Sequence, residues 1–390
     1  MPRVELLAAA LAASLALGCE TTPTTGANAQ GGAPDFGQAP DPESPTGGVV
    51  TFADDFRIDH DDWARLGYRW DWTAHPYISP RGVLRSFTPA GDLVIAQESG
   101  SSVSVLEARS GRLLWTSQLG SRFTKFVGSV RDGDVILVSS ASELFELGAT
   151  TGNLISKSRF KFLVDTAPVL VGNLAVYGSN SGKLLAHNRD TGVIAWAYAL
   201  DGPIETPPVL VGDEIVAGIS RGGDVIFLDP FTGTSVGRAK IAGGSVSAPV
   251  ADAERLYVAS LDQSIYAFDA LGGALAWRVR TEYPITTQPT LHDGTLYITL
   301  RDHGLTAFDA VDGSLRWRND KASGVVIGMR DGELLVAEGE RLALVDPDNG
   351  DVIRSHDFPG AVRITTDAFV DGALYVTGRT GVIVRFVPRS

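Results

Sequence analysis

A repeat of about 40 residues is the feature that most constrains how this chain folds. Each copy contains a turn that ends in glycine, and seven such glycines follow one another at intervals of 41, 40, 41, 40, 40 and 37 residues: Gly111, Gly152, Gly192, Gly233, Gly273, Gly313 and Gly350. This period is typical of arrays in which each supersecondary unit buries its apolar surface against its neighbours. The 390 residues therefore indicate one continuous repeat domain.

The residues around each repeat glycine have structural explanations. Five copies carry Asp or Asn four residues before the glycine: Asn188, Asp229, Asp269, Asp309 and Asp346. Such a side chain accepts a hydrogen bond from a nearby backbone N–H, and glycine supplies the positive φ of the turn. Four copies carry a tryptophan four residues after the glycine, where it can pack against the neighbouring sheet: Trp115, Trp196, Trp277 and Trp317. The other three copies carry Ser156, Gly237 and Arg354 there.

Each repeat also contains about four short, mostly apolar strands. In the fifth repeat we expect them at residues 247–250, 255–260, 264–269 and 274–280. The central strands are nearly all apolar, which is typical of strands covered on both faces. Units of this length with four strands predict the blades of an all-β fold, the β-propeller.

The number of blades follows from the two ends of the repeat region. Beyond the seventh turn the chain offers three more strands, at residues 362–368, 373–377 and 382–387. The aromatic segment 66–72 precedes the first full blade and has no blade of its own. We predict that it supplies the missing outer strand, because a closed ring leaves no long exposed edges. This gives an eight-bladed β-propeller with four-stranded antiparallel blades; seven blades is the alternative.

The turn sequences resemble the pyrroloquinoline quinone (PQQ) repeat. The segments FDALGGALAW, FDAVDGSLRW and HNRDTGVIAW carry this resemblance, together with TAPVLVGN, TPPVLVGD and TTQPTLHDG. It covers residues 66–390 and implies the eight-bladed propeller of the quinoprotein alcohol dehydrogenase-like superfamily. Among lipoproteins of this size, the chain is similar to the outer-membrane protein assembly factor family, BamB. That resemblance implies a non-catalytic role in positioning the barrel-inserting subunit of an assembly complex.

The chain departs from that family in two inter-blade loops. In the family, long loops after the third and fourth blades contact the partner. The corresponding residues here, 200–205 and 241–245, form short connections. The resemblance therefore implies the fold more directly than it implies the partner.

The N-terminus has the pattern of an exported lipoprotein. The apolar stretch from Leu6 to Leu17, 12 residues long, is too short to span a bilayer and precedes Cys19, the chain's single cysteine. The pattern resembles the bacterial lipobox, which implies acylation of Cys19; an ordinary secretory signal is the alternative. We expect a signal peptide at 1–18, a flexible linker at 19–50 and the propeller at 51–390. Glu20 instead of Asp implies an outer-membrane lipoprotein facing the periplasm, with surface exposure as the alternative.

Composition excludes several classes of function. A net charge of −13 argues against a nucleic-acid partner, since phosphate binding needs clustered Lys and Arg. One cysteine allows no internal disulfide and no Cys-type zinc site, and the six histidines show no zinc spacing. The acidic residues between positions 54 and 62 are interpreted as a solvated segment, with a cation site as the alternative, and Phe56 and Trp63 are expected to pack this segment onto the ring. The resemblance also includes the PQQ-dependent dehydrogenases, which have the same fold. Those enzymes carry long insertions in their blades and a pair of adjacent cysteines, and this chain has neither.

These observations predict a monomeric, non-catalytic scaffold with no metal and no cofactor, which binds a protein partner along one rim of the ring and the membrane through its lipid. The candidate contact residues lie in loops between blades: Asp201, Glu205, Glu282 and Tyr283. The alternative is a PQQ-binding or other redox or ligand-binding propeller that uses its central funnel. The two differ in funnel chemistry, because an enzyme needs converging carboxylates and cations there.

Cys19→Ser tests the predicted anchor. We expect the variant to move from the detergent phase to the aqueous phase of a detergent phase-separation assay, because acyl chains supply most of the membrane affinity. A variant that stays with the detergent phase as the wild type does would contradict lipidation at Cys19.

Overall fold

The computed structural model describes residues 50–54, 56–121 and 123–389. All of them belong to the compact unit Asp41–Ser390, one of the two units of the chain. The predicted signal peptide, Cys19 and the linker up to residue 49 lie outside the described residues. In the described part of the chain, no helix is long and apolar enough to cross a membrane.

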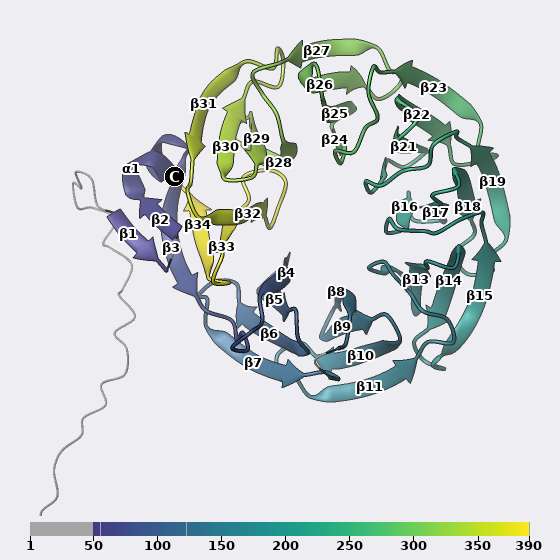
Figure 1. Cartoon of the computed structure of the whole chain (residues 1–390), viewed down its shortest axis with the longest axis horizontal. Helices are drawn as coiled ribbons and strands as arrows, with labels where there is room; N and C mark the ends of the chain where they lie inside the picture. The colour runs from purple at the N-terminus through teal and green to yellow at the C-terminus, as the bar shows by residue number, and fades with distance from the viewer. Residues whose placement is uncertain (1–49, 55, 122, 390) are drawn as a thin grey trace, which may run out of the picture. The chain divides into compact units, whose positions relative to one another are not determined.

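Eight four-stranded antiparallel sheets form a ring (Figure 1), so the predicted eight-bladed propeller is confirmed and the seven-bladed alternative is wrong. From inner to outer strand, blades one to four are β4 (Leu84–Ala90), β5 (Leu93–Glu98), β6 (Ser102–Glu107), β7 (Leu113–Gln118); β8 (Phe126–Asp132), β9 (Val135–Ser140), β10 (Glu143–Gly148), β11 (Leu154–Arg159); β12 (Val169–Val171), β13 (Leu174–Gly178), β14 (Lys183–Asn188), β15 (Val193–Ala199); and β16 (Val209–Val211), β17 (Ile215–Ile219), β18 (Asp224–Leu228), β19 (Ser235–Lys240).

Blades five to eight are β20 (Val250–Ala251), β21 (Arg255–Ser260), β22 (Ser264–Asp269), β23 (Leu275–Arg280); β24 (Thr290–His292), β25 (Thr295–Leu300), β26 (Gly304–Asp309), β27 (Leu315–Asn319); β28 (Val325–Arg330), β29 (Glu333–Glu338), β30 (Arg341–Val345), β31 (Val352–Asp357); and β32 (Ala361–Thr366), β33 (Leu374–Gly378), β34 (Ile383–Pro388), β3 (Tyr68–Ala74). The middle strands are buried on both faces, as β21 and β22 show, whereas in the outer strand β23 only Trp277 is buried. The core therefore lies between blades.

The ring is closed by a strand from the N-terminal side of the domain, as the sequence predicts. β3 pairs with β34, from Tyr68 opposite Pro388 to Ala74 opposite Ile383, and completes blade eight. Arg330 ties the two chain ends together, because its guanidinium donates to the backbone oxygens of Gly67 and Arg389. The same side chain forms an ion pair with Asp371 at 3.0 Å.

The repeat turns lie between the third and outer strands of the blades. In all seven, the glycine N–H donates to the backbone oxygen four residues earlier, at 2.8–3.1 Å. Asp229 shows the side-chain contribution, since its Oδ1 accepts from the backbone N–H groups of Phe231 and Thr232 at 2.9 and 2.8 Å. Both sets of bonds lie within the turn itself, so they hold the turn without any contact from the next blade.

A tryptophan of one blade docks on the turn glycine of the next at five of the eight seams. The indole Nε1 of Trp72, Trp115, Trp196, Trp277 and Trp317 donates to the backbone oxygen of Ala108 (3.0 Å), Ala149 (2.9 Å), Pro230 (2.7 Å), Ala310 (2.9 Å) and Pro347 (2.6 Å), respectively. The rings lie against Gly111, Gly152, Gly233, Gly313 and Gly350, where an added Cβ would approach a ring atom to 2.4–2.7 Å. Trp72, on the closing strand, is a member that the spacing rule alone does not find.

Two of the other seams use different contacts. Between blades two and three, the half-buried Arg189 pairs with Glu146 at 2.6 Å and with Asp132 at 2.5 Å. Between blades four and five, glycines bring the two backbones together: the Gly272 N–H donates to the Val236 oxygen at 3.0 Å. A Cβ on Gly237 would lie 2.6 Å from the Gly273 nitrogen, so a side chain there has no room.

The seam between blades seven and eight is covered by a small N-terminal extension: β1 (Val50–Ala53), β2 (Phe56–Asp59) and α1 (His60–Arg65). Asp59 caps α1 by accepting from the backbone N–H groups of Asp61 and Asp62. Trp63 of α1 is fully buried and stacks between Phe358 and Phe386, with ring centroids 4.1 and 3.6 Å away. Blade eight has no turn between its third and outer strands, because its outer strand β3 comes from the N-terminal side of the domain. The Trp63 side chain, from outside the repeat, fills the seam there instead.

One buried histidine lies inside the ring wall. His187 on β14 is fully buried, and neither of its ring nitrogens has a hydrogen-bond partner among the described residues. The Phe160 ring meets it edge-on at 5.1 Å. Burial lowers the pKa of His187, and the nearby Glu146 carboxylate offsets this only in part.

Gly350→Ala and Gly332→Ala separate docking from backbone strain. Both glycines have φ near +80°, but a Cβ on Gly350 would lie 2.4 Å from the Trp317 ring, whereas one on Gly332 meets nothing within 4 Å. Each variant bears a strain of about 1 kcal/mol, and Gly350→Ala bears an additional overpacking cost of about 1–3 kcal/mol. Chemical denaturation measures both; equal losses of unfolding free energy would contradict the docking account.

Acid is expected to destabilise the ring through His187. The unfolded chain takes up a proton near pH 6.5 and the buried imidazole does not, so this contribution to stability is complete above pH 6.5 and is lost as the pH falls below it, by at most about 1.4 kcal/mol per pH unit. Melting temperatures at pH 7.5 and 5.5 should differ less in His187→Leu than in the wild type. An identical difference in both proteins would refute the assignment.

Candidate functional site

The two ends of the blades form two chemically different faces of the ring. One face, here called the loop face, carries the inter-blade connections 200–208, 241–249 and 281–289 together with the turns between second and third strands. Backbone bonds join these two kinds of segment, as between Arg221 N and Pro203 O (2.7 Å) and between Leu261 N and Gly244 O (3.1 Å). The glycine turns lie at the opposite ends of the strands, on what is here called the turn face, because neighbouring strands run in opposite directions.

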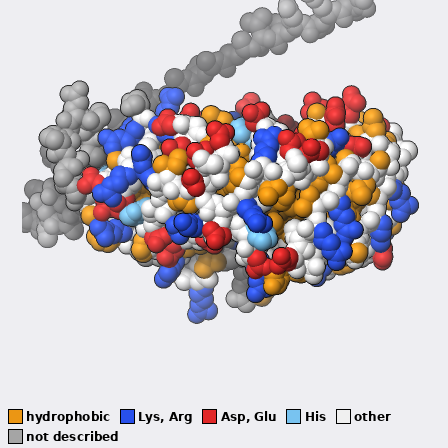
Figure 2. Space-filling model, turned by 90° about the horizontal axis from the view of Figure 1, so that it is seen from above, with side chains coloured by type: hydrophobic (Ala, Val, Ile, Leu, Met, Phe, Trp, Pro, Cys, Tyr) orange, Lys and Arg blue, Asp and Glu red, His pale blue; other side chains and the backbone are white. Residues whose placement is uncertain are grey.

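The side of the ring's outer edge that Figure 2 shows has no single dominant charge. In the edge-on view of Figure 2, acidic, basic and hydrophobic side chains are interspersed, with hydrophobic side chains gathered on the right-hand half. A mixed edge gives little long-range attraction for a charged partner. A specific site is therefore expected at the blade ends, where loops are the variable element of a repeat fold.

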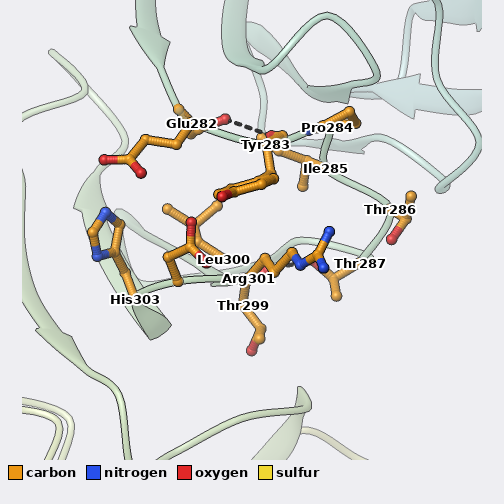
Figure 3. Close-up of a pocket in the computed structure, with 12 residues that line it drawn as sticks. Glu282, Tyr283, Pro284, Ile285, Thr286, Thr287, Thr299, Leu300, Arg301 and His303 are labelled. Carbon is orange, nitrogen blue, oxygen red and sulfur yellow. Dashed lines mark hydrogen bonds between the residues drawn. The ribbon is translucent and has the colours of Figure 1, made fainter.

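A cavity of about 350 Å³ opens on the loop face beside blade six (Figure 3). The connection from β23 to β24 supplies Glu282 and Tyr283, and the turn from β25 to β26 supplies Arg301, Asp302 and His303. The Arg301 guanidinium lies over the Tyr283 ring, 5.0 Å from its centroid. The cavity thus combines an aromatic ring with charges of both signs.

The wall of this cavity is held by hydrogen bonds and by one buried side chain. Thr281 Oγ1 donates to the Tyr283 oxygen at 2.9 Å, and Thr287 Oγ1 donates to the Thr299 oxygen at 2.6 Å. Ile285 is buried beneath the loop, and its N–H donates to the Ser260 oxygen at 3.1 Å. Tyr283 nevertheless remains 40% exposed, so a fixed backbone presents an accessible aromatic ring.

The other two candidate contact residues lie elsewhere on the loop face, between blades three and four. Asp201 has 81% of its side chain exposed and is 3.7 Å from the Lys240 ammonium, and Glu205 pairs with Arg221 at 2.9 Å. The Asp201 N–H donates to Asp224 at 2.7 Å. Partial burial raises the pKa of Asp224, but this N–H and Lys240 lower it more, so its net pKa is below the usual value.

The structure therefore pairs Glu282 with Tyr283 in one cavity and places Asp201 and Glu205 in another loop. Sequence reasoning missed Arg301, Asp302 and His303, which share this cavity with Tyr283 because the β25–β26 turn lies next to the connection before it. Their one visible signal is the polar turn RDHG of blade six.

The acidic side chains of the described residues do not gather around a shared metal position. A Ca²⁺ ion needs about six to eight oxygen ligands that converge at one point. No group of three or more His, Cys, Asp or Glu side chains within residues 50–389, positions 55 and 122 aside, is placed to hold a metal ion. The described carboxylates therefore do not by themselves converge on a common Ca²⁺ position.

Comparison with known proteins agrees with this architecture. The family described as "Outer membrane protein assembly factor BamB" matches residues 99–244 and 221–386. The BamB of Burkholderia pseudomallei is 27% identical over 165 residues, 42% of this chain and 40% of that protein. The quinoprotein alcohol dehydrogenase PedH of Pseudomonas putida is 28% identical over 107 residues, 24% of this chain and 18% of that protein.

A solved structure shows the same fold. The crystal structure of BamB from Moraxella catarrhalis superimposes with a TM-score of 0.64 at 19% identity, over 80% of this chain and 100% of that one. The aligned stretches span about half or less of the BamB relatives' own lengths. Because the family matches both halves of the ring and more than half of the chain, the chain belongs to the family of the outer-membrane protein assembly factor BamB.

Proposed function

We propose that this chain is a non-catalytic scaffold of the cell envelope that holds a protein component of the outer-membrane protein assembly machinery. The observation that carries the proposal is the family match over residues 99–386, which runs from the third strand of blade one to the third strand of blade eight. In this proposal Cys19 anchors the chain to the outer membrane, and the ring lies in the periplasm as a single copy.

The loop face supplies the contact surface in this proposal. Tyr283 presents an exposed aromatic ring on a fixed backbone, and aromatic and arginine side chains contribute most to protein interfaces. Glu282, Asp201 and Glu205 add exposed carboxylates on the same face. A preorganised surface loses little conformational entropy when it binds, which favours a scaffold role.

A redox propeller is the second candidate, since PedH shares 28% identity over 107 residues with this chain. The described carboxylates do not cluster as a Ca²⁺ site requires, which weighs against the redox propeller. The two candidates differ in an assay, because only the redox propeller reduces an artificial electron acceptor in the presence of PQQ, Ca²⁺ and an alcohol.

Affinity purification of the tagged, full-length chain from its own cells tests the scaffold proposal. We expect a subunit of the outer-membrane protein assembly machinery to co-purify, and we expect Glu282→Ala/Tyr283→Ala to reduce its yield about tenfold, as truncation of an interface anchor does. The matched control is Leu271→Ala/Glu254→Ala, which removes one exposed apolar and one exposed acidic side chain from the turn face.

Three results would overturn the proposal: no assembly subunit in the purified material, an equal loss in the control variant, or PQQ-dependent turnover by the wild type. The melting temperatures of both variants should match that of the wild type, because all four side chains are exposed.

A further inference from the structure

Blade one breaks a rule that four other blades follow at the end of their second strand. The equivalent residues in blades two to five are Ser140, Ser179, Ser220 and Ser260, all at most 1% exposed. Each serine hydroxyl accepts a backbone N–H in the adjoining turn, from Glu143, Lys183, Asp224 and Asp262, respectively, at 2.9–3.2 Å. The fold therefore needs only a small hydroxyl there, but blade one carries Glu98.

Glu98 is a buried carboxylate without a cation beside it. The residue is 3% exposed, and within the described part of the chain no Lys, Arg or His nitrogen lies within 4.0 Å of it. Its Oε2 accepts one backbone N–H, from Ser79 at 2.7 Å. Burial of a charge with so few partners is unfavourable, and replacement by the serine of the other blades would remove this cost.

Two glycines make the room that the carboxylate occupies. A Cβ on Gly82 would lie 2.5 Å from Oε2, and a Cβ on Gly100 would lie 2.8 Å from Oε1. The carboxylate is thus held from both sides by backbone, on the loop face between the closing strand β3 and blade one. Glu98 and these two glycines together form a recess, in which the glycines accommodate the larger side chain.

The recess opens into a cavity of about 290 Å³ that is rich in hydrogen-bond acceptors. Its lining offers hydroxyls, one carboxamide and one carboxylate, with no Lys, Arg or His: Tyr77, Ser79, Glu98, Gly100, Ser101, Ser102, Thr116 and Gln118. Gln118 uses its amide nitrogen to donate to Ser101 Oγ at 3.2 Å, which leaves its carbonyl oxygen as an acceptor. Tyr77 is 51% exposed and lines the same cavity.

Two basic residues lie on the other side of Glu98 and leave its charge uncompensated. Arg85 and Lys125 line a neighbouring cavity of about 180 Å³ that shares Glu98. Lys125 is engaged with Asp165 at 3.2 Å, and Arg85 is more than 4.0 Å from the carboxylate. The side of Glu98 that faces Tyr77 therefore remains the acceptor side.

We propose that this cavity binds a protonated primary amine, whose ammonium group is seated against Glu98. An ammonium has three N–H donors and no acceptor, which matches a carboxylate surrounded by hydroxyl and carbonyl oxygens. The Tyr77 ring face attracts a cation as well. The ammonium comes either from a lysine side chain of another protein or from a small free amine. This ammonium site in blade one is independent of the scaffold function proposed for the chain.

The test measures binding of n-butylammonium to the folded, full-length chain by calorimetry, with neutral n-butanol as the matched probe. We expect saturable binding of n-butylammonium only, and at least tenfold weaker binding in Glu98→Gln, which keeps the shape and the acceptor for Ser79. Glu98→Ser, which restores the residue of blades two to five, should lose binding and keep or raise the melting temperature. Arg85→Gln is the control variant and should bind the amine at least as tightly as the wild type.

Two peptides with blocked N-termini separate the sources of the ammonium: a short glycine-flanked lysine peptide and the same peptide with an acetylated lysine, which should not bind. Tighter binding of the lysine peptide than of n-butylammonium assigns the site to a protein side chain, and the reverse order assigns it to a free amine. No binding of any of these ammonium probes to the wild type, equal binding of n-butanol, or unchanged affinity in both Glu98 variants would overturn the proposal.

Discussion

The contact between a tryptophan ring and the turn glycine of the next blade is the interaction on which this ring depends. A four-stranded blade has no core of its own, so each of its faces must be buried against a neighbour. At five seams an indole ring covers a glycine and donates to a backbone oxygen beside it. The glycine is needed twice, for its positive φ and for the absence of a Cβ.

The three remaining seams show that the ring needs a tight contact more than it needs tryptophan. An ion pair of Arg189 joins blades two and three, and a glycine-to-backbone approach joins blades four and five. Trp63 from α1 fills the seam at which the ring closes. Each solution brings the blades close enough to bury the strands between them.

Residues that differ from the repeat pattern are the best candidates for binding sites in this fold. Repeated residues such as Gly313 are explained by turns and docking, so they say little about a partner. Glu98 replaces a serine that the fold uses four times, and Tyr283 with Arg301 builds a cavity on one blade. Neither is required by blade geometry, and both lie on the face that carries the connections between blades.

The repeat and the closing strand followed from the amino-acid sequence, which also favoured eight blades over seven, because turn glycines and docking tryptophans are local signals that recur at a fixed period. The sequence also pointed to Glu282 and Tyr283 as exposed residues of a connection. Only the tertiary structure placed Arg301 over Tyr283, added Trp72 to the docking set and buried Glu98 between Gly82 and Gly100. These contacts join segments from different strands or blades, and their geometry depends on how the strands twist and the ring closes, which no local pattern encodes.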